Sequence, residues 1–353
     1  MRTLHTTSLR RSCVRSATES RYFLQEQCVT GGGESRFAVK RLRTDVRQDP
    51  AKAWTGMVDL VVETRILCHL QHPNIIKVRA VSRGNPLRAD YFLVLDRLTE
   101  TLQDRITKWK SKLTKPGPKL LRPFRFRDTS DDGALWQERL TNAFELTSAI
   151  EHMHNERVIH RDLKPENIGY DFRGDIKIFD FGLSRQIPST EDVHHLSMMT
   201  GSLRYMSPEV AKGEPYNQRC DVYSFTVLLW QMLALRTPYN RYRSIDHLID
   251  GIFEWNERPK IHKRWPQSVQ QILKGGWNAD QFQRLDISEM CLMLRRELKA
   301  CRPGISAPVD SHWMRRSSRV FEFKDHRLSL LRKHPQGLIA DIDFGLDDSE
   351  RTP

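Results

Sequence analysis

The feature that most constrains this chain is a dense group of polar residues near its middle. Residues 160–167 read His-Arg-Asp-Leu-Lys-Pro-Glu-Asn, and the tripeptide Asp180-Phe181-Gly182 follows them after a short apolar stretch. Taken one at a time, each of these charges is typical of a solvated loop. Because carboxylates, an amide and an ammonium group occur together, we expect a fold that brings them to one polar site.

The order of short strands and longer helices predicts the fold class. Short β-favouring runs lie at 22–29, 36–42, 75–81 and 91–95. A helix over 51–70 is expected from one apolar face, made of Trp54, Val58, Val61, Val62, Ile66 and Leu70. Later candidate helices lie at 102–113, 136–150, 218–235, 244–254, 266–274 and 287–299. The sequence therefore predicts an α+β fold with a small β-rich lobe and a larger, mainly helical one.

Composition excludes a membrane-spanning protein and a cysteine-based metal site. No apolar run in the 353 residues approaches the roughly 20 residues that a spanning helix needs. The six cysteines form no CxxC pair and show no metal-ligand spacing, as expected in a reducing compartment. We therefore predict a cytoplasmic protein with ample material for a hydrophobic core.

The net charge of +13 comes from two segments. Residues 1–18 hold four arginines and no acid, and residues 105–127 hold nine basic residues and no acid. We interpret the second segment as part of a solvated basic insertion, 105–134; docking to an acidic protein or to nucleic acid is the alternative. Since the rest of the chain is charge-balanced, nucleic acid is not the expected partner.

Residues 160–167, Asp180-Phe181-Gly182 and Ser207-Pro208-Glu209 together resemble the protein kinase family of the serine/threonine type. The resemblance implies a two-lobed kinase fold that uses ATP and Mg²⁺ to phosphorylate Ser or Thr hydroxyls of protein substrates. It implies that four residues act in transfer: Asp162 as catalytic base, Lys164 as the cation beside the phosphate, and Asn167 and Asp180 as metal ligands. Such chemistry needs mainly positioning and charge neutralisation.

The small lobe extends the resemblance to the phosphates of ATP. Phe37-Ala38-Val39-Lys40 resembles the third-strand motif whose lysine holds the α- and β-phosphates. The helix around Glu63 and the turn after it resemble the element that supplies an anionic partner to this lysine. We therefore expect a Lys40–Glu63 ion pair.

The adenine end of the site is expected in residues 91–98, which resemble the strand and hinge that grip the base. The resemblance implies cofactor-binding roles for Leu95 as gatekeeper, and for Asp96 and Leu98. Gly169, however, stands where the family usually has a bulky apolar residue beneath adenine. A glycine gives little contact there, so we expect weak ATP affinity unless neighbouring side chains fill the gap.

Residues 180–209 resemble the activation segment of the family. Arg161 corresponds to an arginine that often pairs with a phosphorylated residue of this segment, which makes Ser197 and Thr200 the candidate sites. An unmodified polar loop is the alternative. A Ser or Thr at the position of Ser202 is typical of serine/threonine enzymes.

Three more residues are expected to support the fold of the larger lobe. Asp221 resembles the helix residue that anchors the backbone of the catalytic loop, and Arg284 resembles the ion-pair partner of Glu209. The sequence of residues 200–211 and 221–233 is most similar to that of the tyrosine-kinase-like group of serine/threonine kinases.

The sequence departs from the family pattern at its start. No glycine precedes Gly31, and the triplet Gly31-Gly32-Gly33 lies too close to Lys40 to be the family's glycine-rich loop. We interpret the triplet as the next hairpin turn, so the first strand and the glycine-rich loop are predicted to be missing. A second Asp-Phe-Gly, at 343–345, lies in an acidic stretch and is attributed to chance.

These expectations give a domain plan and a function. Residues 1–20 are expected to be a flexible basic leader or a truncated start, with a transit peptide as the alternative. Residues 21–300 form the kinase domain, with lobes at 21–96 and 97–300, and residues 301–353 form a C-terminal tail. The predicted function is ATP-dependent phosphorylation of proteins on Ser or Thr, with a pseudokinase scaffold as the alternative. The oligomeric state is left open.

Overall fold

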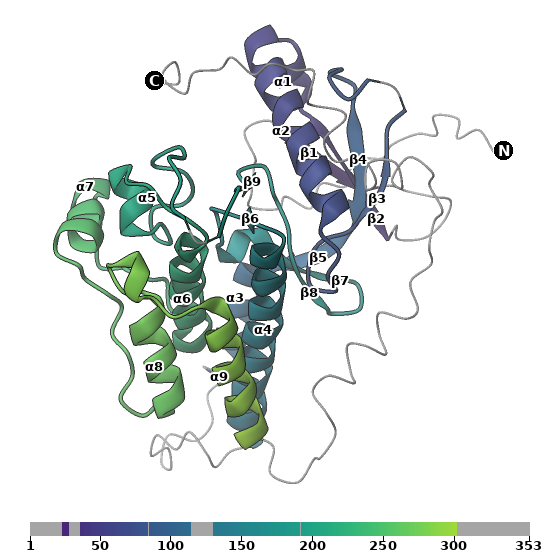
Figure 1. Cartoon of the computed structure of the whole chain (residues 1–353). Helices are drawn as coiled ribbons and strands as arrows, with labels where there is room; N and C mark the ends of the chain where they lie inside the picture. The colour runs from purple at the N-terminus through teal and green to yellow at the C-terminus, as the bar shows by residue number, and fades with distance from the viewer. Residues whose placement is uncertain (1–22, 28–35, 84, 114–129, 191, 302–353) are drawn as a thin grey trace.

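The computed structural model describes residues 23–27, 36–83, 85–113, 130–190 and 192–301. Within them, a small lobe of strands and one long helix lies above a larger helical lobe (Figure 1). The predicted α+β, two-lobed architecture is confirmed. The predicted leader, the Gly31-Gly32-Gly33 turn, the C-terminal tail and the second Asp-Phe-Gly all lie outside the described residues.

The small lobe is built on an antiparallel sheet that, among the described residues, has four strands in the order β1-β2-β4-β3. They are β1 (Phe23–Gln27), β2 (Phe37–Leu42), β3 (Val78–Val81) and β4 (Phe92–Asp96). Alternation along β2 buries Ala38, Lys40 and Leu42 on one face. β1 pairs with β2 as predicted. The residues before β1, where a first strand was predicted to be missing, are outside the described part.

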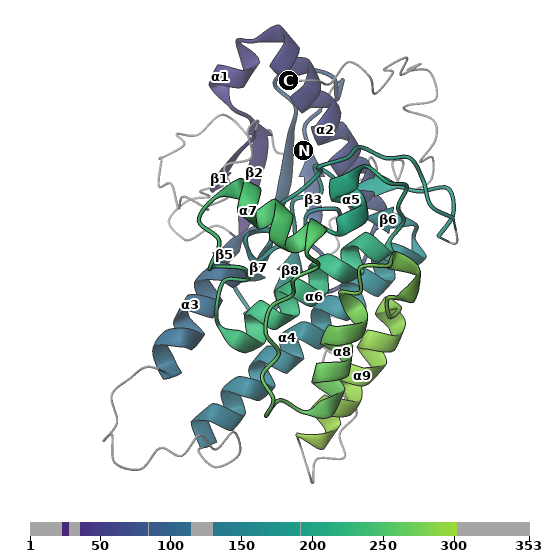
Figure 2. The same ribbon diagram turned by 90° about the vertical axis from the view of Figure 1, so that its left-hand side faces the viewer.

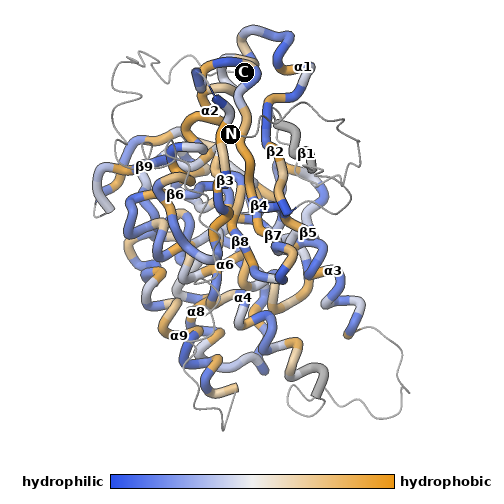
Figure 3. Tube along the Cα trace, turned by 90° about the vertical axis from the view of Figure 1, so that its right-hand side faces the viewer, coloured by the Kyte–Doolittle hydropathy of each residue, from blue (hydrophilic) through white to orange (hydrophobic). Residues whose placement is uncertain are grey.

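Two helices follow β2, namely the short α1 (Thr44–Arg47) and the long α2 (Pro50–His69). α2 begins at a proline after Asp49, whose side chain accepts a hydrogen bond from the Lys52 backbone N–H. Hydrophobic stretches run along α2 and β4 (Figure 3). The predicted buried face of α2 is partly wrong, because Trp54 is 46% exposed while Leu60 and Glu63 are buried. The buried side of the helix carries Leu60 and Leu67 together with Glu63, which pairs with a lysine of the sheet.

The large lobe surrounds an almost fully buried central helix, α6 (Arg219–Ala234). The other helices are α3 (Leu102–Leu113), α4 (Ser130–Asn155), α5 (Pro208–Lys212), α7 (Ile245–Ile249), α8 (Gln267–Gly276) and α9 (Ile287–Ala300). α4 packs against α6 and α9, and α8 packs against α6 and α9 (Figure 2). Since α6 touches protein on all sides, its apolar residues show no single hydrophobic face. No helix in this described part combines the length and apolar character needed to cross a bilayer.

Short strands line the boundary between the lobes. β5 (Leu98–Thr101), β7 (Ile168–Asp171) and β8 (Ile176–Ile178) form one small sheet, and β6 (Val158–Ile159) pairs with β9 (Arg185–Gln186). The single-turn helix η2 (Pro165–Asn167) leads directly into β7. The catalytic-loop and hinge sequences therefore meet at this boundary.

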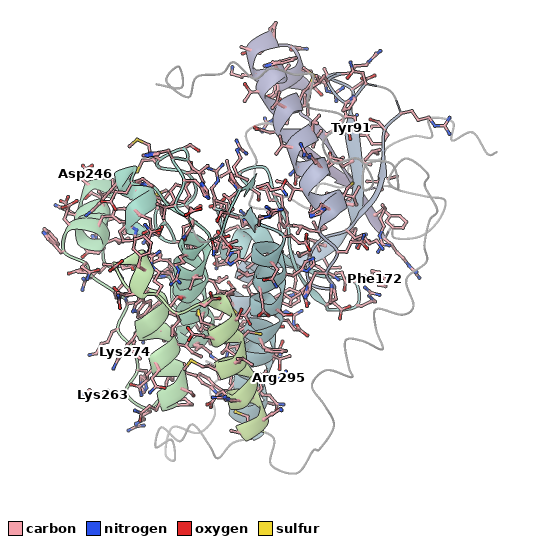
Figure 4. The ribbon with its side chains drawn as sticks, in the orientation of Figure 1. Tyr91, Phe172, Asp246, Lys263, Lys274 and Arg295 are labelled. Atoms are coloured by element: carbon pink, nitrogen blue, oxygen red, sulfur yellow. The ribbon has the colours of Figure 1, made fainter. Side chains whose placement is uncertain are left out.

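Residues just after α2 join the small lobe to the large one. The His72 ring contacts the Ser148 hydroxyl at 3.1 Å and stacks on His152 with 5.5 Å between ring centroids. Asn74 Nδ2 donates to the Ile176 carbonyl at 2.9 Å, and Ile75 forms a parallel bridge with β8. On another side of the boundary, the guanidinium carbon of Arg36 lies 5.1 Å from the ring centroid of Phe172, which is labelled in Figure 4.

Candidate active site

A buried ionic network links the two lobes at the centre of the boundary. Lys40 Nζ, on β2, donates to both carboxylate oxygens of Glu63, on α2, at 2.8 and 2.7 Å. The same ammonium lies 3.0 Å from Asp180 Oδ1. The Phe181 backbone N–H donates to Glu63 at 3.2 Å. The expected Lys40–Glu63 pair is therefore formed, and the Asp-Phe-Gly segment is held in the same network.

The charges of this network determine the pKa values of its members. Burial alone would lower the pKa of Lys40, but the Asp180 and Glu63 carboxylates outweigh it and raise the pKa above its ordinary value. Burial would raise the pKa of Asp180, yet the Lys40 ammonium lowers it overall. Lys40 and Asp180 therefore both carry their charges at neutral pH.

The two oxygens of the Asp162 carboxylate differ in their hydrogen bonds. Its Oδ2 accepts hydrogen bonds from Lys164 Nζ at 2.7 Å and from Asn167 Nδ2 at 2.9 Å. Asn167 Nδ2 also donates to the Asp162 carbonyl at 2.9 Å. Asp162 Oδ1 and Asn167 Oδ1 are both buried and lack a hydrogen-bond partner in the described part of the chain. Each of these two side chains therefore has one oxygen acceptor without a hydrogen bond among the described residues.

Asp221, on α6, anchors the backbone that carries Asp162. Its carboxylate accepts hydrogen bonds from the backbone N–H groups of His160, at 2.8 Å, and Arg161, at 2.9 Å. His154 Nε2 lies 3.2 Å from the same carboxylate. Burial would raise the pKa of Asp221, but the hydrogen bond from His154 and those from the backbone lower it. Arg161 has a positive φ of 68°, so these bonds stabilise a left-handed backbone just before Asp162.

The predicted activation segment approaches the catalytic loop at Gly201, a residue to which the sequence assigned no individual role. Gly201 has a φ of +100°, and a Cβ atom there would lie 2.3 Å from the Arg161 carbonyl oxygen. Only glycine allows this approach. The next residue, Ser202, accepts a hydrogen bond from Lys164 Nζ at 2.9 Å. Gly201 lies within the predicted segment 180–209, and its being a glycine was the signal available in the sequence.

Arg161 contacts one of the two candidate hydroxyls of the activation segment. Its guanidinium donates to Ser197 Oγ at 2.9 Å and to the Tyr216 hydroxyl at 3.2 Å. Tyr216 donates in turn to the Ser197 carbonyl at 3.0 Å. Thr200 Oγ1 instead donates to the carbonyl of Ser197 at 3.0 Å and, among the described contacts, does not reach Arg161.

Glu209 and Arg284 form the expected buried ion pair. Two guanidinium nitrogens of Arg284 donate to the two carboxylate oxygens of Glu209, each at 2.6 Å. Both side chains are almost fully buried. The planar guanidinium matches the carboxylate in this two-bond geometry, so the pair fixes the end of the activation segment against the large lobe.

At the hinge, the structure places Leu95 in the core with 2% of its surface exposed. The Asp96 carboxylate accepts two hydrogen bonds from Arg79, at 2.7 and 2.9 Å. Leu98 lies directly against Gly169, because a Cβ atom on that glycine would be 2.8 Å from Leu98 Cδ1. The gap expected at Gly169 is therefore filled by a neighbouring side chain.

The described part of the basic segment is partly neutralised by acidic neighbours. Arg105 donates to Glu100 at 2.7 Å and to Glu138 at 3.0 Å, and Lys108 forms a second ion pair with Glu100. The Arg105 guanidinium also lies 4.1 Å from the centre of the Tyr170 ring. Residues 114–129 of the segment are outside the described part.

With this geometry in place, comparison with known proteins identifies the family. Residues 26–293 match the family model of the protein kinase domain. The chain belongs to the protein kinase family. This kinase chain is 33% identical over 162 residues to a probable LIM domain-containing serine/threonine-protein kinase of Dictyostelium discoideum, covering 46% of the chain and 16% of the relative.

Two further relatives support the same family. Serine/threonine-protein kinase PrkC of Bacillus subtilis is 29% identical over 233 residues, covering 64% of this kinase chain and 31% of PrkC. Serine/threonine-protein kinase STY17 of Arabidopsis thaliana is 30% identical over 163 residues, covering 46% of the chain and 28% of STY17. The matched regions thus span less than a third of these three relatives' lengths.

Proposed function

We propose that this chain is an ATP-dependent protein serine/threonine kinase with Asp162 as the catalytic base. The observation that carries the proposal is the asymmetry of the Asp162 carboxylate. Lys164 and Asn167 hold Oδ2, whereas the buried Oδ1 has no partner among the described residues. A carboxylate fixed in this way can accept the proton of a substrate hydroxyl and orient its oxygen toward a phosphate.

The neighbouring groups fit the phosphates of ATP and a divalent cation. Lys40 is a buried ammonium whose orientation Glu63 fixes, which suits it to bind phosphate oxygens. The unpartnered Asn167 Oδ1 and the Asp180 carboxylate are the hard oxygen donors that Mg²⁺ prefers. When bound, Mg²⁺ would neutralise charge on the phosphates and orient them for transfer.

Lys164 is proposed to act on the acceptor side of the reaction. Its ammonium contacts both Asp162 and Ser202, so it lies between the catalytic loop and the activation segment. A cation there can neutralise the phosphate as it is transferred. The contact with Ser202 supports a Ser or Thr acceptor docked on the segment around Gly201.

We further propose Ser197, rather than Thr200, as the residue whose phosphorylation activates the enzyme. Ser197 Oγ already lies 2.9 Å from the Arg161 guanidinium, whereas Thr200 bonds only to the segment itself. A phosphate on Ser197 would form charge-assisted hydrogen bonds with Arg161, whose next residue is Asp162. Substituting Ser197 with alanine should then remove the activation that phosphorylation of the chain produces.

Phosphotransfer by the purified chain tests the proposal. Wild type, Asp162→Asn and the surface control Asp246→Asn are incubated with Mg²⁺, radiolabelled ATP and a generic basic protein. We expect Asp162→Asn to lose roughly 10²- to 10⁴-fold in rate, and Asp246→Asn to match wild type. Equal incorporation by wild type and Asp162→Asn would refute the assigned base.

Phosphoamino-acid analysis of the product tests the acceptor class. Some relatives are dual specificity kinases, such as shkD of Dictyostelium discoideum, which is 28% identical over 243 residues. Phosphoserine and phosphothreonine without phosphotyrosine are the expected products. The alternative of a catalytically silent scaffold predicts no ATP-dependent rise in melting temperature. A rise of several degrees that Lys40→Ala removes would exclude this alternative.

A further inference from the structure

The side chain of Leu98 occupies the space that any residue other than glycine would need at position 169. A Cβ atom built on Gly169 would lie 2.8 Å from Leu98 Cδ1, 3.3 Å from Leu98 Cβ and 3.1 Å from the Glu100 carbonyl oxygen. Contacts this short force the neighbour to move. The observed position of the Leu98 side chain therefore requires a glycine at position 169.

The direction of strand β7 shows which side of the boundary this contact faces. Tyr170 points toward the helices of the large lobe, where its hydroxyl accepts a hydrogen bond from Asn142, on α4, at 2.9 Å. Neighbouring residues of a strand point to opposite sides. Position 169 therefore faces away from α4, and Leu98, the residue two positions after the end of β4, lies on that side.

An irregularity in the pairing of β5 with β7 places Leu98 there. The register between the two strands shifts between Leu98 and Glu100, so Leu98 pairs with Asp171 while Thr101 pairs with Gly169. An extra residue of this kind bends a strand and redirects its side chains. Leu98 is half-buried, so part of its apolar surface remains accessible.

The small lobe supplies an apolar surface facing the same site. Ala38 is buried on the face of β2 that also carries Lys40, and it is paired with Leu95, at the end of β4 nearest the hinge. A group held by Lys40 through its phosphates would extend along this face toward the hinge. The base of a nucleotide would then meet Ala38 from above and Leu98 from below.

We propose that Leu98, in place of a side chain at position 169, forms the apolar surface on which the base of the nucleotide rests. The inference rests on the proposed kinase function and concerns the same site. Gly169 then does not weaken nucleotide binding. It is required because it leaves room for Leu98, whose apolar side chain contacts the flat face of the base.

Binding of two ligands separates contact with the base from general support of the fold. Dissociation constants are measured by calorimetry, with Mg²⁺, for ATP and for ribose 5-triphosphate, which lacks the base. Leu98→Ala should weaken ATP binding by roughly three- to tenfold, as expected for a partly buried leucine, and leave ribose 5-triphosphate unaffected. Leu98→Met, which keeps an adaptable apolar side chain, should bind ATP within about twofold of wild type.

A double-mutant cycle tests the mutual dependence of the two residues. In the wild type, Gly169→Ala should weaken ATP binding, because the new methyl group displaces Leu98 Cδ1. In the Leu98→Ala background the same change should weaken ATP binding less, because Leu98 Cδ1 is gone and only the closer approach to the Glu100 carbonyl oxygen remains. This difference between the two backgrounds supports the proposal.

The outcomes also separate this inference from the kinase proposal. If wild type binds ATP and Leu98→Ala binds it equally well, or if Gly169→Ala weakens ATP binding equally in both backgrounds, the role of Leu98 is refuted while the kinase proposal stands. An equal loss for ATP and ribose 5-triphosphate in Leu98→Ala would likewise refute contact with the base. Wild type that binds neither ligand would overturn the kinase proposal itself.

Discussion

Replacing Asp221 with asparagine is expected to destabilise the large lobe and to displace the catalytic loop. The carboxylate accepts three hydrogen bonds, from the backbone N–H groups of His160 and Arg161 and from the His154 ring. Asparagine has nearly the same shape but only one acceptor oxygen. One buried N–H group must therefore face the new amide NH₂ without a partner.

The cost follows from these contacts. A buried donor left without an acceptor costs about 1–3 kcal/mol, and a hydrogen bond that loses its charged partner weakens by about 1 kcal/mol. Asp221 is fully buried, so solvent screening does not reduce these values. The free energy of unfolding should therefore fall by about 3 to 5 kcal/mol in Asp221→Asn.

Urea unfolding and phosphotransfer together check this prediction. Asp246→Asn, an exposed aspartate on α7, is the matched control and should change the unfolding free energy by less than about 0.5 kcal/mol. Because Asp221 also holds the strained Arg161 backbone, the rate should fall at least tenfold under conditions where Asp221→Asn is folded. An unfolding free energy within about 1 kcal/mol of wild type would refute the anchoring role.

Three other perturbations have expected outcomes. Lys40→Met leaves the Glu63 carboxylate buried without its cation, so the unfolding free energy measured in urea should fall by about 3–5 kcal/mol. Adding Glu63→Gln to Lys40→Met should recover part of this loss. Further destabilisation by the second change would contradict the ion-pair reasoning. Arg284→Lys keeps the charge but loses the pair of parallel hydrogen bonds to Glu209, so the melting temperature should fall by several degrees. An unchanged melting temperature would show that this ion pair contributes little to stability. The pKa of Asp221 lies below its ordinary 3.8 in the folded chain, so its contribution to stability is present above about pH 4 and is lost as the pH falls. The unfolding free energy of wild type should therefore approach that of Asp221→Asn toward pH 2. A difference that stays constant with pH would contradict the lowered pKa.

Much of the fold and the polar site could be predicted from the sequence, because both depend on local patterns. Alternating and helical periodicity place β2, β4 and the helices near their observed positions. The residues of the candidate site were predicted because their motifs resemble those of the kinase family. A role for Asp162, Asn167 and Asp180 in binding phosphate and metal stays a prediction.

Features that depend on packing between distant segments could not be predicted. The buried face of α2 includes Glu63, a charged residue that periodicity alone would place in solvent. The predicted helix over 244–254 divides into α7 and the π-helical turn η3 (Asp250–Glu254). A Cβ atom on Gly251 would lie 2.3 Å from the Tyr242 hydroxyl oxygen, so the backbone and this ring are in close contact.

The contact of Leu98 with Gly169 shows the same limit at the candidate site. From the sequence, Gly169 indicates a gap beneath the base, because a glycine has no side chain. The leucine that fills this gap lies far away in the chain and reaches it through an irregularity in strand pairing. No local pattern reports such an irregularity.

Because contacts with the large lobe hold the C-terminal end of α2, a rotation of this helix relative to the large lobe would be centred on that end. His72 and Asn74 tie its C-terminal end to the large lobe, and at 1.5 Å per residue Glu63 lies about 9 Å from that end. A swing of about 15° would carry the carboxylate about 2 Å from Lys40, enough to break their hydrogen bonds. Trp54 is exposed and lies more than twice as far from that end, so the same rotation would move Trp54 more than twice as far as Glu63.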